Sequence, residues 1–155
     1  MNFDQAFDRL IGHEGGYACN PADPGGETKW GISKRSYPNE HIASLTLARA
    51  KALYLRDYWA PAGCEAVPDA LRFDLFDTAV NSGVSAAIRL LQNAAGVAAD
   101  GVLGPVTLQA LGAAHSATVV ARFNGWRLAM MANTPQFATF GRGWARRIAE
   151  NLKQA

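Results

Sequence analysis

Residues 69–83 read DALRFDLFDTAVNSG, and this stretch decides the fold class. Its apolar residues cover most of the circumference of a helix instead of one stripe (Leu71, Phe73, Leu75, Phe76, Ala79 and Val80). A helix that is apolar nearly all round is normally buried at the centre of a domain. We therefore predict a central helix over about residues 69–81, ended by Asn81-Ser82-Gly83.

Further helices are predicted on both sides of this central one. Apolar residues recur with helical spacing, and Gly or Pro follows, over residues 3–12, 46–59 and 86–95. Thr46 and Ser85 stand where two of these helices need N-caps, and Leu47 and Leu55 are expected on a buried face. Pro105 opens another helix, and two longer helices follow over residues 116–132 and 136–152.

The 155-residue chain is long enough for one domain, and 49% of its residues are hydrophobic. No long strand-like alternation appears, so we predict a mainly α fold with a small loop or β region around residues 15–33. Residues 1–155 are expected to form a single compact domain. A soft boundary near residues 83–85 would separate a lobe that carries the loop (1–84) from a helical lobe (85–155).

Charge and hydropathy argue against several classes of protein. The formal net charge is only +2, without the dense basic stripes of nucleic-acid-binding proteins. No apolar run is long enough to cross a bilayer, so stable membrane insertion is not expected. Residues 1–5 lack the pattern of a signal peptide, which predicts synthesis in the cytoplasm. The late cations are interpreted as a solvated helix face, with attraction to an anionic surface such as a bacterial envelope as the alternative: Arg142, Arg146, Arg147 and Lys153.

The sequence gives no sign of a metal site or a cofactor. Its three histidines are widely spaced, and neither an HExxH nor a CxxC pattern is present. The nucleophile pattern GxSxG is absent as well. Cys19 and Cys64 could form a disulfide in an oxidising compartment, but free thiols are expected at synthesis.

Two carboxylates occupy the glycine-rich loop that follows the first helix. Glu14 lies in His13-Glu14-Gly15-Gly16-Tyr17, at the end of an apolar helix face where partial burial would raise its pKa. Asp23 lies in the turn sequence Asp23-Pro24-Gly25-Gly26, where exposure favours the ionised form. A proton-donating acid near a second, charged carboxylate suits cleavage of a glycosidic bond. Thr28 could orient the attacking water through its hydroxyl.

Structural explanations for the same residues remain open. The glycine pairs by themselves fit a helix stop and a turn, although a long loop inside a compact domain is uncommon unless it is functional. Glu27 is a rival acid in this loop, but its neighbour Lys29 suggests a solvated ion pair. A short hairpin is expected around Lys29-Trp30-Gly31-Ile32.

Candidate substrate-binding residues are aromatic or amide side chains in or near the loop. Tyr17 and Trp30 could present aromatic faces to sugar rings, and Trp59 could do the same or could pack in the core. Asn81 could bind an N-acetyl group or a water with its amide, or it could cap the end of the central helix.

These motifs resemble the signature of glycoside hydrolase family 108, a family of N-acetylmuramidases that includes many phage endolysins. The resemblance is carried by Glu14-Gly15-Gly16-Tyr17, Asp23-Pro24-Gly25-Gly26, Thr28 and Gly31-Ile32. Residues 77–83 are similar to a second block of the family. Residues 100–107, which read DGVLGPVT, resemble a turn of its C-terminal peptidoglycan-binding region.

The resemblance implies a lysozyme-like helical fold and hydrolysis of the β-1,4 bond between N-acetylmuramic acid and N-acetylglucosamine. It implies Glu14 as the catalytic acid, with Asp23 and Thr28 as its partners. The implied substrate is the glycan strand of bacterial peptidoglycan. We expect a monomeric endolysin that a holin releases into the periplasm, with no metal or cofactor.

Three other functions fit the same residues. One is an export-associated muramidase that serves a secretion or flagellar system. A lytic transglycosylase needs the acid Glu14 but no partner that activates water. A non-catalytic peptidoglycan-binding or secretion-accessory protein needs neither carboxylate, and the presence of both weighs against it. For a hydrolase, the separation of the Glu14 and Asp23 carboxyl groups would decide between inversion and retention.

Overall fold

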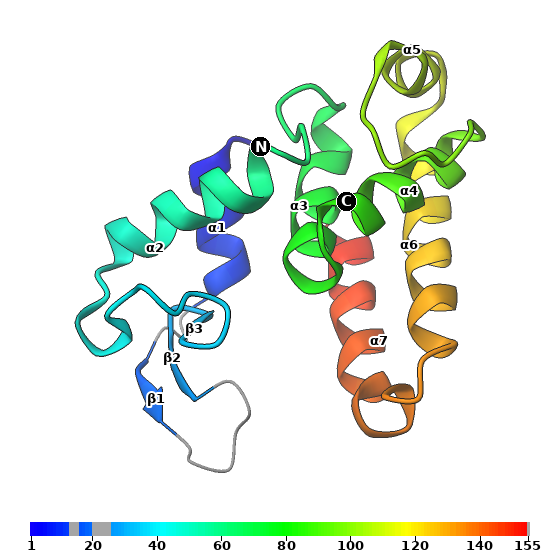
Figure 1. Cartoon of the computed structure of the whole chain (residues 1–155). Helices are drawn as coiled ribbons and strands as arrows, with labels where there is room; N and C mark the ends of the chain where they lie inside the picture. The colour runs from blue at the N-terminus through cyan, green and yellow to red at the C-terminus, as the bar shows by residue number, and fades with distance from the viewer. Residues whose placement is uncertain (13–15, 20–25, 155) are drawn as a thin grey trace. The chain divides into compact units, whose positions relative to one another are not determined.

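A computed structural model describes residues 1–12, 16–19 and 26–154 of the chain (Figure 1). These residues form seven α-helices, a small three-stranded sheet, one 3₁₀ turn and one π-helical turn. The chain divides into two compact units, one of residues 2–57 and one of Met1 with residues 58–155. The predicted mainly α fold with a small β region around residues 15–33 is confirmed.

The first unit begins with α1 (Phe3–Ile11), which is capped at both ends. The Asn2 side chain accepts a hydrogen bond from the Gln5 backbone N–H, and the Gln5 side chain accepts one from the Asn2 backbone N–H. Phe7 is buried in the core of the unit, and the C-cap is Gly12 with a φ of 60°. The predicted helix over residues 3–12 is therefore confirmed.

Three short strands form an antiparallel sheet in the order β1 (Ala18–Cys19), β2 (Glu27–Lys29) and β3 (Ile32–Ser33). Thr28 lies opposite Ala18 on one side and opposite Ser33 on the other. The hairpin that was expected around residues 29–32 is the β2–β3 pair.

The predicted helix over residues 46–59 is present, but it changes type part-way. After the 3₁₀ turn η1 (Ile42–Ser44), α2 (Leu47–Tyr54) begins with the expected N-cap, since Thr46 Oγ1 accepts a hydrogen bond from the Arg49 N–H at 3.2 Å. The chain then continues as the π-helical turn η2 (Leu55–Trp59). Leu47 and Leu55 are 44% and 42% exposed, so their expected burial was wrong. Leu55 opens the π-helical turn, where the rotation per residue differs from that of an α-helix.

The second unit is built around α3 (Asp69–Ser82), whose residues 73–79 are all buried. The helices α4 (Val84–Ala95) and α6 (Ser116–Ala132) pack against it, which confirms the predicted central helix. Two more helices complete the unit, because α5 (Pro105–Ala113) packs against α4 and α7 (Phe137–Lys153) packs against α6.

The turn between α3 and α4 is made by Gly83, whose φ is 89°. Gly83 is also the N-cap of α4, so Ser85 lies inside the first helical turn and its expected capping role was wrong. The expected boundary near residues 83–85 falls at this turn, between two helices of the same unit. Pro105 occupies the first turn of α5, as predicted.

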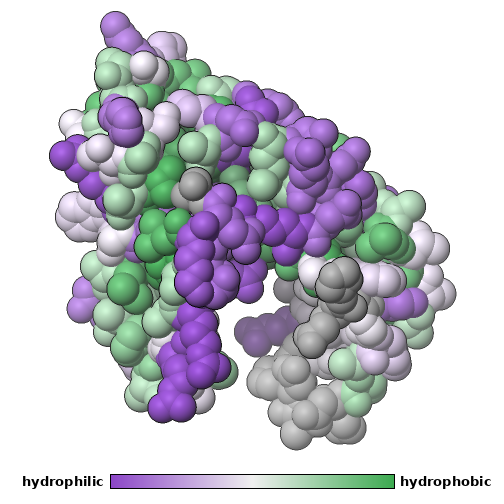
Figure 2. Space-filling model, turned by 180° about the vertical axis from the view of Figure 1, so that it is seen from behind, coloured by the Kyte–Doolittle hydropathy of each residue, from purple (hydrophilic) through white to green (hydrophobic). Residues whose placement is uncertain are grey.

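Hydrophilic side chains lie between small groups of apolar ones on the face of the molecule shown in Figure 2. Val102, Val106 and Phe140 are the most exposed of the large apolar side chains among the described residues. None of the described helices is both long and apolar enough to cross a membrane.

Candidate active site

The segments that carry the two candidate carboxylates adjoin well-defined elements. Gly12, the C-cap of α1, is two residues before Glu14 in the sequence, and the paired strands β1 and β2 flank residues 20–25. Glu14 and Asp23 themselves lie outside the described residues. The described elements nearest to them in the sequence are the end of α1, the sheet and the β2–β3 turn, which are called the frame below.

Tyr17 and Glu27 form a hydrogen bond within this frame. The Tyr17 hydroxyl donates to Glu27 Oε1 at 2.7 Å, and this bond raises the pKa of Tyr17 well above its usual value. Lys29 Nζ instead donates to the Ala43 carbonyl at 3.0 Å, so the expected Glu27–Lys29 pair was wrong. Tyr17 is 47% exposed, which leaves part of its ring accessible to a ligand.

Thr28 and the rival acid Glu27 point to different faces of the sheet. They are consecutive residues of β2, and successive side chains of a strand alternate between the two faces. Ser33 lies opposite Thr28 and Cys19 lies opposite Glu27 in the register of the sheet. A substrate on the Thr28 face would therefore meet the hydroxyls of Thr28 and Ser33 and not the Glu27 carboxylate.

Trp30 adopts an unusual backbone conformation in the two-residue turn between β2 and β3. Its φ is 52° and that of Gly31 is 75°, the combination that a type I′ hairpin turn requires. A bulky residue with positive φ costs about 1–3 kcal/mol, so the surrounding structure must hold it in place. Tyr54 does so, because its hydroxyl donates to the Trp30 carbonyl at 3.2 Å.

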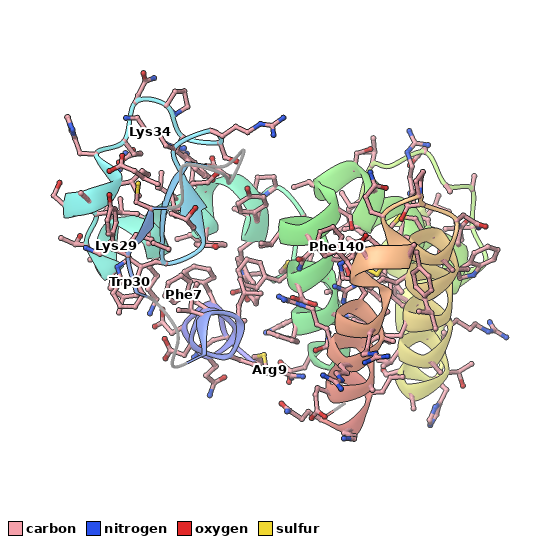
Figure 3. All side chains as sticks on the ribbon, turned by 90° about the horizontal axis from the view of Figure 1, so that it is seen from below. Phe7, Arg9, Lys29, Trp30, Lys34 and Phe140 are labelled. Carbon is pink, nitrogen blue, oxygen red and sulfur yellow. The ribbon has the colours of Figure 1, made fainter. Side chains whose placement is uncertain are left out.

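A pocket of about 450 Å³ lies between this turn and the end of α1. Figure 3 shows Phe7 of α1 and Trp30 of the turn side by side. Trp30 Nε1 is buried and has no hydrogen-bond partner among the described residues. The residues that line the pocket are Phe7, Asp8, Arg9, Ile11, Gly12, Trp30 and Leu47.

Two further candidate residues belong to the second unit. Trp59 is only 1% exposed, packs edge-on against Phe76 and donates from Nε1 to Glu65 Oε1 at 3.2 Å. This position favours core packing over stacking on a sugar ring. Asn81 lies inside α3, where its amide donates to the Asp77 carbonyl at 2.6 Å. Gly83 is the C-cap of α3, so the alternative role of Asn81 as helix cap was wrong.

A buried charge network on α3, α6 and α7 was not predicted from the sequence. Arg127 Nη1 lies 2.7 Å from Asp77 Oδ2, and Arg147 Nε donates to Asp77 Oδ1 at 2.8 Å. The contact between Arg127 and Asp77 is an ion pair and not a hydrogen bond, because none of the Arg127 N–H groups is aligned with an acceptor among the described residues. Burial would raise the pKa of Asp77, but the hydrogen bond from Arg147 and the charges of both arginines outweigh it and lower that pKa.

Asp74, one turn earlier on α3, shares this buried region. Its carboxylate accepts hydrogen bonds from the amides of Asn124 at 2.9 Å and Asn151 at 2.8 Å. Burial raises the pKa of Asp74, because no arginine contacts it as closely as Arg147 contacts Asp77. Two aspartates spaced i, i+3 on an otherwise apolar helix were the sequence signal that could have revealed the network. Arg147 was also misassigned, since it contacts a buried carboxylate instead of forming a purely solvated face.

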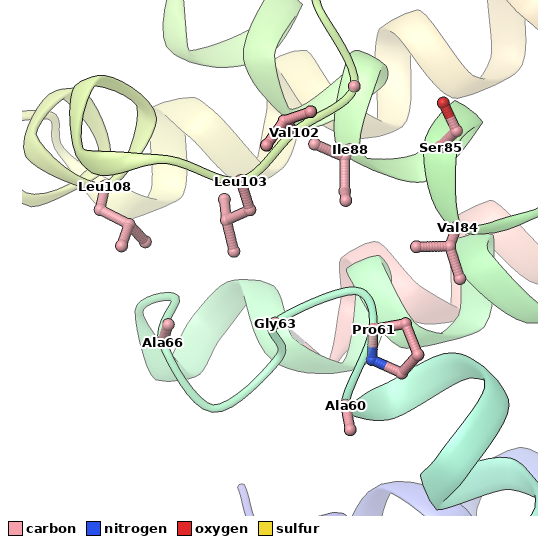
Figure 4. A pocket seen from close by; sticks show the side chains of 11 residues that line it. Ala60, Pro61, Gly63, Ala66, Val84, Ser85, Ile88, Val102, Leu103 and Leu108 are labelled. Atoms are coloured by element: carbon pink, nitrogen blue, oxygen red, sulfur yellow. The ribbon is translucent and has the colours of Figure 1, made fainter.

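A second cavity, of about 560 Å³, lies within the helical unit (Figure 4). Its walls come from the loop before α3, the start of α4 and the turn before α5. Ser85 is the one polar side chain among the described residues that line it. Val102 and Leu103 belong to the turn that resembles a wall-binding motif.

No group of three or more His, Cys, Asp or Glu side chains that could hold a metal ion occurs in residues 1–12, 16–19 or 26–154. Cys19 is exposed and Cys64 is buried, and both are free thiols in the structure. Burial raises the pKa of Cys64 to about 12.

The part of the chain that contains these elements matches a known protein family. Residues 7–83 match the family model described as Glycosyl hydrolase 108. These residues are therefore similar to a glycosyl hydrolase 108 domain, and this similarity supports a glycoside hydrolase. The matched stretch includes the end of α1, the whole sheet and the sequence positions of Glu14, Asp23 and Thr28.

A solved structure extends the likeness beyond this domain. "Structure of Brucella abortus SagA" is 29% identical to this chain, covers 98% of it and 92% of its own length, and has a TM-score of 0.87. The fold is thus mainly α and lysozyme-like, as the sequence predicted. No curated protein was found to match the chain.

Proposed function

We propose that the chain is an N-acetylmuramidase that hydrolyses the β-1,4 bond between N-acetylmuramic acid and N-acetylglucosamine in bacterial peptidoglycan. The observation that carries the proposal is the glycosyl hydrolase 108 match over residues 7–83. That match supports peptidoglycan-degrading glycosidase activity. The bond that is cut is inferred from the resemblance of the Glu14, Asp23 and Thr28 motifs to the family's muramidases.

In this proposal Glu14 donates a proton to the leaving oxygen of the glycosidic bond. General acid catalysis of this kind contributes about 10²–10⁴-fold to a rate. Asp23 stays ionised and either stabilises positive charge on the sugar ring or, with Thr28, positions the attacking water. Tyr17 and Trp30 are proposed to contact the glycan, and Asn81 is a candidate partner for an N-acetyl group.

Mass analysis of purified peptidoglycan after digestion tests the reaction. Hydrolysis at the proposed bond leaves reducing N-acetylmuramic acid ends. Anhydro ends would show a lytic transglycosylase, and uncut strands would show a binding protein without activity. Asp23→Ala separates the first two further, because a transglycosylase that needs no activated water would keep most of its rate.

The proposed setting is the periplasm, where a monomeric phage endolysin would reach the wall after release by a holin. Its support is the resemblance to a family that includes phage endolysins. Expression in the cytoplasm of a Gram-negative bacterium tests it, because lysis should require a co-expressed holin. Lysis at the same rate without the holin would contradict this part of the proposal.

Residues 85–155 are proposed to contribute to wall binding through the turn Asp100-Gly101-Val102-Leu103-Gly104-Pro105. The support is the motif together with the apolar cavity that Val102 and Leu103 border (Figure 4). Val102 is exposed, so Val102→Asp should weaken cosedimentation with purified cell walls without unfolding the protein. Unchanged cosedimentation would remove this turn from the binding surface.

A further inference from the structure

We propose that the outward face of α7 docks the protein on the anionic headgroups of a phospholipid bilayer. Arg142, Arg146 and Lys153 form this face and are called the basic face of α7. Docking here means adsorption to the membrane surface, because none of the described helices could span a bilayer. The inference goes beyond the proposed function, since α7 lies outside the matched residues 7–83.

Charge is distributed unevenly along the chain. Residues 101–155 contain six Arg or Lys residues and one acidic residue, Glu150. Residues 1–100 contain nine Arg or Lys residues and twelve Asp or Glu residues. The formal net charge of +2 therefore combines an acidic larger part with a basic C-terminal part. A basic part of this kind is attracted to an anionic surface even when the chain as a whole is nearly neutral.

Two arginines of the basic face have no carboxylate partner, unlike many cations in the rest of the chain. Arg142 and Arg146 are exposed, and neither forms an ion pair within the described part of the chain. Four basic side chains from earlier in the chain are each paired with a carboxylate: Arg49, Lys51, Arg56 and Arg72. The charge of Arg142 and Arg146 is therefore available to an external anion.

The opposite side of α7 holds the helix on its unit, so that the basic face points to solvent. Figure 1 shows α6 and α7 side by side, and Ile148 of α7 is buried. The Asn151 amide donates to a carboxylate of α3 at 2.8 Å. Arg142 and Arg146 are four residues apart and Lys153 follows seven residues later, so helical spacing places all three on the side away from the buried one.

An exposed aromatic ring lies beside the basic face. Phe140 is 55% exposed, although its ring lies against that of Trp144 with centroids 6.0 Å apart. By helical spacing, Gly143 lies between Phe140 and Arg146, so no side chain separates the ring from the guanidinium. Aromatic rings are favoured at the boundary between headgroups and acyl chains. The ring therefore favours a lipid surface over an acidic polymer, which has no apolar layer to receive it.

Cosedimentation of the full chain with vesicles tests the proposal. Vesicles of equal parts phosphatidylglycerol and phosphatidylcholine should bind the wild type, whereas phosphatidylcholine alone should bind it at least about tenfold more weakly. Arg146→Glu should weaken binding to the anionic vesicles about tenfold or more, because each charge near such a surface changes the affinity about fivefold. Arg35→Glu is the matched control, since Arg35 is exposed in the first unit and its reversal changes the net charge equally.

Glu150→Gln is a second test that loss of folding cannot imitate, because it should strengthen binding. Glu150 is the one acid of residues 101–155, and its side chain is 58% exposed and paired with Lys153. Removing its charge should raise the affinity for the anionic vesicles about fivefold. Phe140→Ser tests the ring and should weaken binding about threefold or more. Val106→Ser is its control, since Val106 is 70% exposed on α5 of the same unit.

Several outcomes would overturn the docking face: absence of wild-type binding to the anionic vesicles, equal affinities of Arg146→Glu and Arg35→Glu, or weaker binding by Glu150→Gln. Unchanged binding by Phe140→Ser together with a loss in Arg146→Glu would show a contact by charge alone and would overturn the lipid assignment. Vesicle binding does not require that peptidoglycan is cut, so a failure of the proposed reaction would be seen separately.

Discussion

Asp77 and Arg127 form an ion pair in which both side chains are fully buried, with Arg127 Nη1 2.7 Å from Asp77 Oδ2. Arg147 donates to the other oxygen of the same carboxylate. One side chain of α3 therefore connects to both α6 and α7. A buried pair of this kind is costly to break from one side, because the remaining charge stays buried.

Arg127→Met should lower the free energy of unfolding by about 3 kcal/mol or more, since methionine keeps much of the volume but leaves Asp77 short of a counter-charge. Urea denaturation followed by circular dichroism measures the change. Arg146→Met is the control, because Arg146 is exposed on α7 and its loss should cost less than about 0.5 kcal/mol. Equal urea midpoints for the two variants would show that the buried pair contributes nothing.

The stability supplied by Asp77 should disappear in acid. Its folded-state pKa is lowered by Arg147 and Arg127 despite burial, so its contribution is present above the unfolded value of about 3.9. It is lost as the pH falls through the lower, folded pKa. The difference in unfolding free energy between wild type and Asp77→Asn should therefore be large at pH 7 and shrink below about pH 4. A difference that stays constant over this range would contradict the assignment.

Gly31→Ala should destabilise the first unit by at least about 1–2 kcal/mol. The φ of 75° disfavours any side chain, and a Cβ would collide with the Tyr54 hydroxyl. Gly143→Ala provides the opposite case, because Gly143 lies in α7 with open space around its Cβ position and should stabilise the helix by about 0.5–1 kcal/mol. Thermal melting of both variants measures this contrast, and a stabilising Gly31→Ala would refute the described turn.

One thiol should react in the native protein and two in denaturant. Cys19 is exposed, whereas Cys64 is buried with a pKa of about 12 and is therefore a neutral thiol at pH 8. Titration with an aromatic disulfide reagent counts the reactive groups, and Cys19→Ser should abolish the fast reaction. Rapid modification of Cys64 in the folded Cys19→Ser variant would contradict its burial.

Much of the fold could be predicted because local signals and tertiary packing agree. The apolar circumference of residues 69–81 indicated the central α3, and Thr46 and Pro105 marked helix starts where the structure has them. The prediction that Ser85 caps α4 was wrong, because the turn is made two residues earlier by Gly83, whose positive φ suits glycine. The predicted burial of Leu47 was wrong, because the burial of a helical residue depends on tertiary contacts and not on helical spacing alone.

Less of the candidate site could be predicted from the sequence, because the site depends on contacts between distant residues. Lys29 is adjacent to Glu27 on the same strand face, yet Tyr17 is the partner of Glu27. The Asp77–Arg127 pair joins residues on separate helices, and nothing in the local sequence of either indicates the other. The roles of Glu14, Asp23 and Thr28 stay predictions that rest on motif and family.

The central claim is that Glu14, and not the rival Glu27, is the acid of a peptidoglycan hydrolase. The decisive measurement compares Glu14→Gln and Glu27→Gln by the release of reducing sugar from purified peptidoglycan. We predict that Glu14→Gln loses about 10²-fold or more in rate and that Glu27→Gln stays within a few-fold of wild type. Full activity of Glu14→Gln, or a collapse confined to Glu27→Gln, would contradict the account.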